Sequence, residues 1–294
     1  MIIAADTQSG LPRAPLGEWV DSFVGWVTST FSWFFDLIKG VLTWFFDQLD
    51  TILSGPPFWV VALVLAGLAF WARGWKLGLG AFVGFAVIDM VGQWGNAMDT
   101  LALVLIASAI ALIIAIPLGI WAARNDAVSH LLRPVLDFMQ TMPAFVYLIP
   151  TVVIFLTGEV PGIVATVIFA LAPGVRFTEL GIRQVDREVV EAGHAFGATE
   201  GRIMRQIQLP LALPTIMAGI NQVIMLSLSM VVIAGMVGAA GLGSDVVRAL
   251  QRVNISLGFE AGLAVVILAM FLDRVTSALG DRAPVAKALK TTSA

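Results

Sequence analysis

The sequence predicts an all-α integral membrane protein with about seven transmembrane helices, an N-terminus outside and a C-terminus inside, preceded by an amphipathic interfacial helix. Of its 294 residues, 59% are hydrophobic and 13% are charged, and the mean hydropathy is +0.92. Soluble domains have about 45–50% apolar and about 25% charged residues. A soluble fold of this length has too little interior for so many apolar side chains, so the bilayer is the expected environment.

The spans follow from the length needed to cross the membrane. A hydrocarbon core about 30 Å thick requires about 20 mainly apolar residues at a rise of about 1.5 Å per residue. Five runs carry no charge, although the one at 160–175 is short and must borrow residues at its ends. The run at 77–98 is interrupted only by Asp89, and the last has Glu260, Asp273 and Arg274 at its margins. In chain order the predicted spans are residues 51–72, 77–98, 100–123, 138–158, 160–175, 214–237 and 257–279.

The distribution of Lys and Arg sets the predicted orientation. Cytoplasmic loops carry an excess of these residues. With the N-terminus outside, thirteen of the 17 Lys and Arg fall on the inner side and four on the outer side. The first 17 residues lack the basic start and apolar centre of a secretory signal, so we expect them to be retained.

The segment before the first span has an amphipathic pattern. Within residues 21–50, polar or small residues recur every three or four positions, while Trp and Phe occupy the other faces. Such a helix is expected to lie along the membrane interface. It serves either as a structural collar around the spans or as a lipid-sensing, regulatory element.

A polar stretch, EAGHAFGATEGRIMRQIQLP at residues 191–210, interrupts the apolar runs. Residues 186–198 favour a helix with acids in its early turns, and Gly197 can end or bend it. Thr199 is placed to cap a second helix, which Leu209-Pro210 is expected to stop because proline lacks an amide donor. The product is a compact helix-turn-helix shaped to dock into another protein. The small-residue face of its first helix consists of Ala192, Ala195 and Ala198.

Seven positions in this stretch match the spacing of the EAA loop of ABC importer permeases. Gly193 stands where many members of that family have a second alanine, and glycine costs roughly 1 kcal/mol in a helix interior. The matching residues are Glu191, Ala192, Gly193, Gly197, Ile207, Leu209 and Pro210.

The resemblance extends over about residues 98–274. The stretches LDFMQTMPAFVYLIP, IFALAPGVRFTELGIRQV and LPLALPTIMAGINQVIMLSLSMVVIAGMVGAAGLGSDV resemble the permease subunit of the glycine betaine/proline betaine and choline importers. The implied organisation is an N-terminal tail and amphipathic helix (1–50), two accessory spans (51–97), a permease core (98–280) containing the coupling loop (186–212), and a C-terminal tail (281–294).

The resemblance also implies partners and a location. Permeases of this kind lie in the bacterial cytoplasmic membrane as homodimers, bind a separate ABC ATPase through the EAA loop, and receive solute from an extracytoplasmic binding protein. ATP and Mg would then belong to the ATPase, with no cofactor on this chain. The loop would carry motion of the ATPases to the spans, which would open alternately to each side.

Several classes of protein are not favoured by the sequence. It contains no G-x-x-x-x-G-K-S/T phosphate loop, so the chain is not expected to hydrolyse ATP or to be an enzyme. It has no cysteine, and His130 and His194 are not spaced as a metal pair, so we expect neither a catalytic nor a metal site. The net charge of -3 gives no argument for a nucleic-acid partner.

Five residues are candidates for the solute path. Pro143 and Pro150 loosen the fourth span, and irregular backbone at membrane depth is tolerated where it faces protein or water. Aromatic rings there would offer π-faces to a quaternary ammonium group, and serines of the sixth span would wet the path. Helix packing explains the same residues without a path. The candidates are Met142, Phe145, Tyr147, Ser227 and Ser229.

Two other functional classes compete with an ATP-driven importer. A secondary transporter or channel driven by an ion gradient would be expected to carry paired ionisable residues within the membrane, where this chain offers only Asp89. That residue is itself a functional candidate, unless it has a buried partner or lies near the interface. A membrane receptor or scaffold would use the EAA-like loop for signalling.

Overall fold

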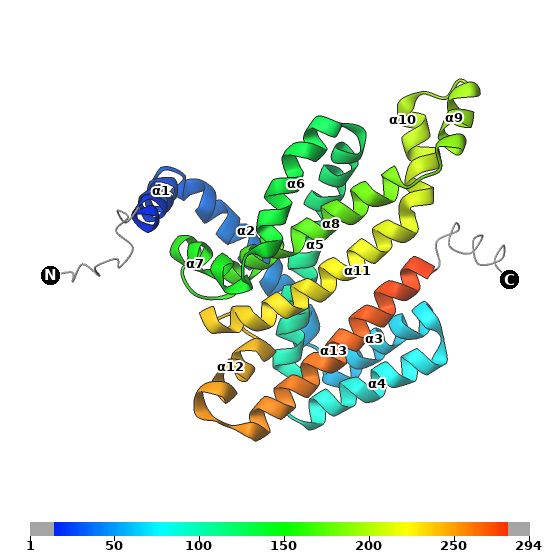
Figure 1. The fold of residues 1–294 in the computed structure, drawn as a ribbon. Coiled ribbons are helices and arrows are strands. Elements are labelled where there is room, and N and C mark those ends of the chain that lie inside the picture. Colours follow the sequence, from blue (N-terminus) through cyan, green and yellow to red (C-terminus); the bar gives the residue numbers. More distant parts are fainter. Residues whose placement is uncertain (1–14, 282–294) are drawn as a thin grey trace, which may run out of the picture.

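The apolar runs fold into helices that pack side by side, with one helical pair projecting from an end of the bundle (Figure 1). The computed structural model describes residues 15–281, and no strand occurs in this part of the chain. The predicted tails at residues 1–14 and 282–294 lie outside the described residues. In chain order the helices are α1 (Leu16–Thr30), α2 (Ser32–Ser54), α3 (Phe58–Arg73), α4 (Trp75–Met90), α5 (Trp94–Arg124), α6 (Asp126–Thr141), α7 (Ala144–Phe155), α8 (Glu159–Arg183), α9 (Arg187–Ala195), α10 (Glu200–Ile203), the π-helix η1 (Met204–Gln208), α11 (Leu209–Ala234), the 3₁₀-helix η2 (Gly235–Val237), α12 (Leu242–Arg252) and α13 (Ile255–Asp281).

The all-α membrane fold is confirmed. Within the described residues, four helical runs are long and apolar enough to cross a membrane: α5, α8, the continuous run Glu200–Val237, and α13. Two further pairs qualify only together, because α2 and α3 meet at 100° and α6 and α7 at 96°. The helices therefore supply four spans, or up to six if each bent pair crosses once. The count of seven and the orientation stay predictions.

Two predicted spans contain sharp bends at proline. Residues 51–72 include the last turn of α2 and all of α3 except Arg73, and the two helices are separated by Gly55, Pro56 and Pro57. Residues 138–158 include the bend at Met142, whose ψ of 136° is extended because the next residue is Pro143. Both spans were wrong as continuous helices. Pro150, in contrast, lies inside α7 without ending it.

The predicted span 77–98 was also wrong in its extent. Helix α4 ends at Met90, the chain turns through Gly92 at φ +71°, and α5 begins at Trp94. Asp89 consequently lies in the last turn of α4, where its carbonyl accepts a hydrogen bond from the Gly92 amide at 2.9 Å. The span predicted at 160–175 was too short, because these residues are part of the longer helix α8.

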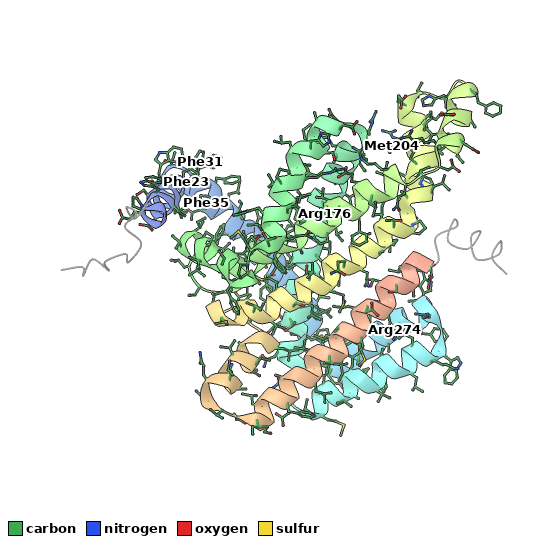
Figure 2. The ribbon with its side chains drawn as sticks, viewed as in Figure 1. Phe23, Phe31, Phe35, Arg176, Met204 and Arg274 are labelled. Carbon is green, nitrogen blue, oxygen red and sulfur yellow. The ribbon has the colours of Figure 1, made fainter. Side chains whose placement is uncertain are left out.

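The amphipathic N-terminal segment is helical, as predicted, but it forms two helices that meet at Phe31. Figure 2 shows Phe23, Phe31 and Phe35 on this arm, which extends away from the bundle. Phe35 packs edge-on against Phe155 of α7, with ring centroids 5.8 Å apart. Further along α2, Leu42 and Phe46 are buried. One end of the arm is thus docked, and its interfacial location stays a prediction.

Helix α8 occupies the centre of the bundle, between α5 and α11. Glycines allow these helices to approach closely: a Cβ atom on Gly119 would lie 2.5 Å from Thr178 Cβ, and one on Gly174 would lie 2.7 Å from Ala115 Cβ. On the other side, a Cβ on Gly219 would lie 2.5 Å from Phe177 Cβ. Small residues at helix contacts are typical of membrane bundles. This packing fixes the helix that carries the projecting pair.

We predict that Gly119→Ala lowers stability. The new methyl group would clash with Thr178 and with the backbone carbonyl of Val175, 2.7 Å from the ideal Cβ position, and such overpacking typically costs about 1–3 kcal/mol. Gly67→Ala in α3 is the matched control, since no atom lies within 4 Å of its Cβ position. Thermal unfolding of both variants in detergent should show a lower midpoint for Gly119→Ala only. Equal midpoints would contradict the close packing of α5 on α8.

Candidate functional site

The projecting pair has two arms: α9, and the helical run formed by α10 and η1. Residues 186–208, which include both arms and the turns that join them, are called the knob below. It extends beyond the ends of α8 and α11 (Figure 1). The Asp186 side chain caps α9 by accepting a hydrogen bond from the Glu188 amide at 2.9 Å. A carboxylate at this position satisfies a free amide and suits the positive end of the helix dipole. The start of α9 is therefore set locally.

The end of α9 is a Schellman motif. The Ala198 amide donates to the Gly193 carbonyl at 3.1 Å, and the Gly197 amide donates to the His194 carbonyl at 2.8 Å. Gly197 has φ +76°, which a residue with a Cβ atom adopts only with strain. The prediction that Gly197 ends this helix is confirmed, and its conformation turns the chain back toward the bundle.

Gly193 allows the two arms of the knob to pack together. It is buried, and a Cβ atom there would lie 2.8 Å from Ile207 Cδ1 and 3.3 Å from Ile203 Cγ1. The glycine therefore affects more than the stability of α9. An alanine at this position would require only the flexible end of Ile207 to shift. Between the same two arms, His194 Nε2 lies 3.6 Å from Glu200 Oε1, an exposed contact that contributes little.

The prediction that Leu209-Pro210 stops the second helix was wrong. Helix runs without interruption from Glu200 to Val237. Just before the proline, residues Met204–Gln208 form a π-helix, in which the Leu209 amide donates to the Met204 carbonyl five residues back. The widened turn lets the chain pass Pro210, which occupies the first turn of α11, where a missing donor is tolerated. The knob is thus joined to α11 by continuous helix.

The seven EAA-like residues divide between the knob's surface and its base. Glu191, Ala192 and Gly197 are exposed, whereas Gly193 is buried between the arms. The other three, Ile207, Leu209 and Pro210, are partly buried where the knob joins the bundle. Thr199 takes the predicted cap position of α10, although its side chain makes no capping hydrogen bond.

Sequence reasoning missed Phe196, which is 92% exposed at the turn of the knob. An aromatic side chain this exposed, on a projection flanked by exposed small residues, is characteristic of a protein contact site. The available signal was a single aromatic residue inside the polar stretch AGHAFGATE. Phe196, Glu191 and Ala192 are thus all exposed on the surface of the knob.

The base of the knob is held by an apolar cluster. Ile182 from α8, Met204 from η1, and Ala212 and Ile216 from α11 are buried together. Figure 2 shows Met204 where the knob meets the bundle. The end of α5 contributes Ile120 and Ala123 to the same cluster. A displacement of the knob would therefore act on three membrane helices.

The five candidate path residues do not share one environment. Tyr147 is buried, donates its hydroxyl proton to the Met139 carbonyl, and packs against Phe169 with centroids 5.9 Å apart. Phe145, on the same helix, is 52% exposed. In α11, Ser227 is fully buried with no hydrogen-bond partner for its hydroxyl, whereas Ser229 is exposed. Met142 is partly buried at the α6–α7 bend. A role in a solute path stays a prediction for all five.

Comparison with known proteins places these features in a family. Residues 115–283 match the family described as binding-protein-dependent transport system inner membrane component. Among similar proteins, OpuAB of Bacillus subtilis (strain 168), a glycine betaine transport system permease protein, is 48% identical over 90% of this chain and 94% of its own length. GbuB of Listeria monocytogenes, a glycine betaine/carnitine transport permease protein, is 48% identical over 93% and 98%. ProW of Escherichia coli (strain K12), a glycine betaine/proline betaine transport system permease protein, is 44% identical over 90% and 75%.

Solved structures support the fold. A chain of the MetNI methionine ABC transporter in an inward-facing conformation matches with a TM-score of 0.57 and 23% sequence identity, over 65% of this chain and 92% of that chain. At this identity the likeness concerns the arrangement of helices alone.

We predict that Gly197→Val loosens the knob and that Gly197→Asn does not. Valine is strongly disfavoured at φ +76°, whereas asparagine tolerates the left-handed region. The cost for valine is about 1–2 kcal/mol. Limited proteolysis with trypsin should therefore cut Gly197→Val faster at Arg202 and Arg205 than it cuts the wild type or Gly197→Asn. Equal cleavage rates for the two variants would contradict this account of the turn.

Proposed function

This chain belongs to the family of binding-protein-dependent transport system inner membrane components, and from that premise we propose that it is the membrane-spanning permease subunit of an ATP-driven importer of quaternary ammonium compounds. The knob is the observation that carries this proposal. It projects from the bundle, is anchored to three membrane helices, and presents an exposed aromatic side chain beside small residues. A secondary transporter would have no use for such a projection.

The proposed partners are an ABC ATPase subunit, an extracytoplasmic substrate-binding protein and a second copy of this chain, in the bacterial cytoplasmic membrane. The ATPase supplies ATP binding and Mg, and the knob supplies its attachment point. In this scheme closure of two ATPases displaces both knobs, and the motion reaches α8 and α11 through the apolar cluster at Ile182 and Met204. The spans then open alternately to each side.

The substrate class is proposed from the chemistry shared by the relatives' solutes. Glycine betaine, proline betaine and carnitine each combine a quaternary ammonium group with a carboxylate. The first three relatives carry these names, and their identity to this chain is 44–48%. Choline shares the cationic group but lacks the carboxylate, so we rank it below the betaines. Affinity would reside mainly in the binding protein, since the permease must pass the solute without trapping it.

Within the proposed path, exposure separates the candidate residues. Phe145 and Ser229 have exposed side chains and are available to a solute between two copies of the chain. The face of the Phe145 ring would attract the trimethylammonium group. Tyr147 and Ser227 are buried within one protomer, and we propose that they support the path from behind, with Met142 at the bend.

The first test is transport by the assembled complex. We expect labelled glycine betaine to enter proteoliposomes that contain this chain, its ATPase and its binding protein only when ATP is supplied on the ATPase side. Labelled choline, measured in parallel, is expected to enter more slowly. ATP-independent uptake that collapses with an ionophore would overturn the proposal in favour of a gradient-driven carrier.

A second test concerns the knob as the ATPase attachment point. Phe196→Ala removes the exposed ring, and central aromatic anchors commonly contribute 2 kcal/mol or more to binding, so we expect roughly a tenfold or greater loss of ATPase co-purification. Trp33→Ala is the matched control, because Trp33 is 68% exposed on the N-terminal arm, away from the knob. Undiminished ATPase binding by Phe196→Ala would place the contact elsewhere.

A further inference from the structure

One buried carboxylate joins two helices where α8 leaves the bundle for the knob. Glu179 is 7% exposed, and its Oε1 accepts a hydrogen bond from Ser129 Oγ at 2.6 Å. Arg183 Nε lies 2.9 Å from the same oxygen, and Arg133 Nη2 lies 3.6 Å from it. Ser129 and Arg133 belong to α6, so this carboxylate connects α8 to α6.

Arg183 extends the connection to α5. Its Nη1 lies 2.8 Å from Asp126 Oδ1, at the start of α6, and its Nη2 donates to the Ala122 carbonyl of α5 at 2.8 Å. Glu179 and Arg183, which lie one turn apart on α8, therefore connect α8 to both α6 and α5. The sequence signal for this cluster was the spacing of Glu179 and Arg183, four residues apart on one helical face.

Burial makes Glu179 different from the neighbouring ion pair. Arg176 and Asp137 also join α8 to α6, but their side chains are 39% and 64% exposed, so water can replace either partner. Figure 2 shows Arg176 on α8, farther from the knob. A carboxylate shielded from water has no such substitute and must keep its partners. Separation of the two helices would remove Ser129 and Arg133 from the Glu179 carboxylate and leave it only Arg183 of its own helix.

Helices α8 and α6 each lead from Glu179 to a part of the chain that moves in the proposed mechanism. Along α8, Arg183 is the last helical residue before the turn into the knob. Along α6, the chain reaches the 96° bend into α7. There the Tyr147 hydroxyl donates to the Met139 carbonyl, which ties α7 back to α6 across the bend.

We propose that Glu179 is a positioning residue that makes α6 and α8 move as one unit, so that displacement of the knob reaches the α6–α7 bend. The proposal rests on the proposed function and adds a residue to its coupling route. Contiguous contacts alone do not establish coupling between distant sites. The role therefore has to be measured as a ratio of ATP hydrolysed to solute transported.

The test compares Glu179→Gln with Asp137→Asn in the complete complex with its ATPase and binding protein. Glutamine keeps the shape of the side chain and can still accept from Ser129, but it loses the charge that holds Arg183. We expect ATP hydrolysed per glycine betaine imported to rise about tenfold in Glu179→Gln and to change less than about twofold in Asp137→Asn. A parallel fall of hydrolysis and uptake with an unchanged ratio would overturn the proposal, because it would indicate a purely structural role.

A distance measurement separates this inference from the proposed function. Spin labels on cysteines at Leu131 of α6 and Leu180 of α8 use side chains that are 71% and 45% exposed. With Glu179 intact, we expect one narrow distance distribution, with or without trapped ATP. In Glu179→Gln the distribution should broaden. An equally narrow distribution in that variant would refute the helix connection, even if transport is confirmed, whereas wild-type complex without ATP-dependent uptake would refute the proposed function alone.

Discussion

The close approach of α8 to α5 and α11 is the contact on which the rest of the structure depends. Lipid is as apolar as the helix surfaces, so the hydrophobic effect does not drive helices together within the bilayer, and van der Waals packing of small residues takes its place. Gly119, Gly174 and Gly219 provide that packing on both sides of α8. Because α8 enters the knob and α11 leaves it, the geometry of their contact also determines where the knob stands.

Polar side chains inside the bundle serve mainly to connect segments that are distant in sequence. The Asn221 side chain donates to Asp273 at 2.9 Å and accepts from Thr276 at 2.6 Å, which joins α11 to α13. At the other end of the bundle, Asn96 donates to the buried Asp245 at 2.6 Å and joins α5 to α12. Such pairs satisfy groups that lipid cannot solvate, and they connect the central helices to α12 and α13.

Such connections between helices suit a permease that is driven, as proposed, from outside the membrane. The described chain has a projecting knob, which is the proposed attachment surface, a continuous helical connection through the π-helix at Met204–Gln208, and bends at two proline sites. Π-helical turns and helix bends are places where a helix can change direction with limited loss of hydrogen bonds. Motion applied at the knob would therefore be expressed at the bends, and the long helices between them would transmit it.

The sequence by itself determined the membrane class, the helical content and the knob, because each depends on local composition or on residues close together in the chain. Asp186 and Gly197, which begin and end α9, act on backbone groups within a few residues.

Only the tertiary structure decided the features that depend on distant contacts. Continuous helix through Pro210 requires the π-helix before it. The angles at the two bends depend on what α2 and α7 pack against. Glu179 stood in a stretch that reads as polar, and its burial arises from Ser129, 50 residues away. Spacing along one helix can place two charges on the same face, but it cannot say which other helix will cover them.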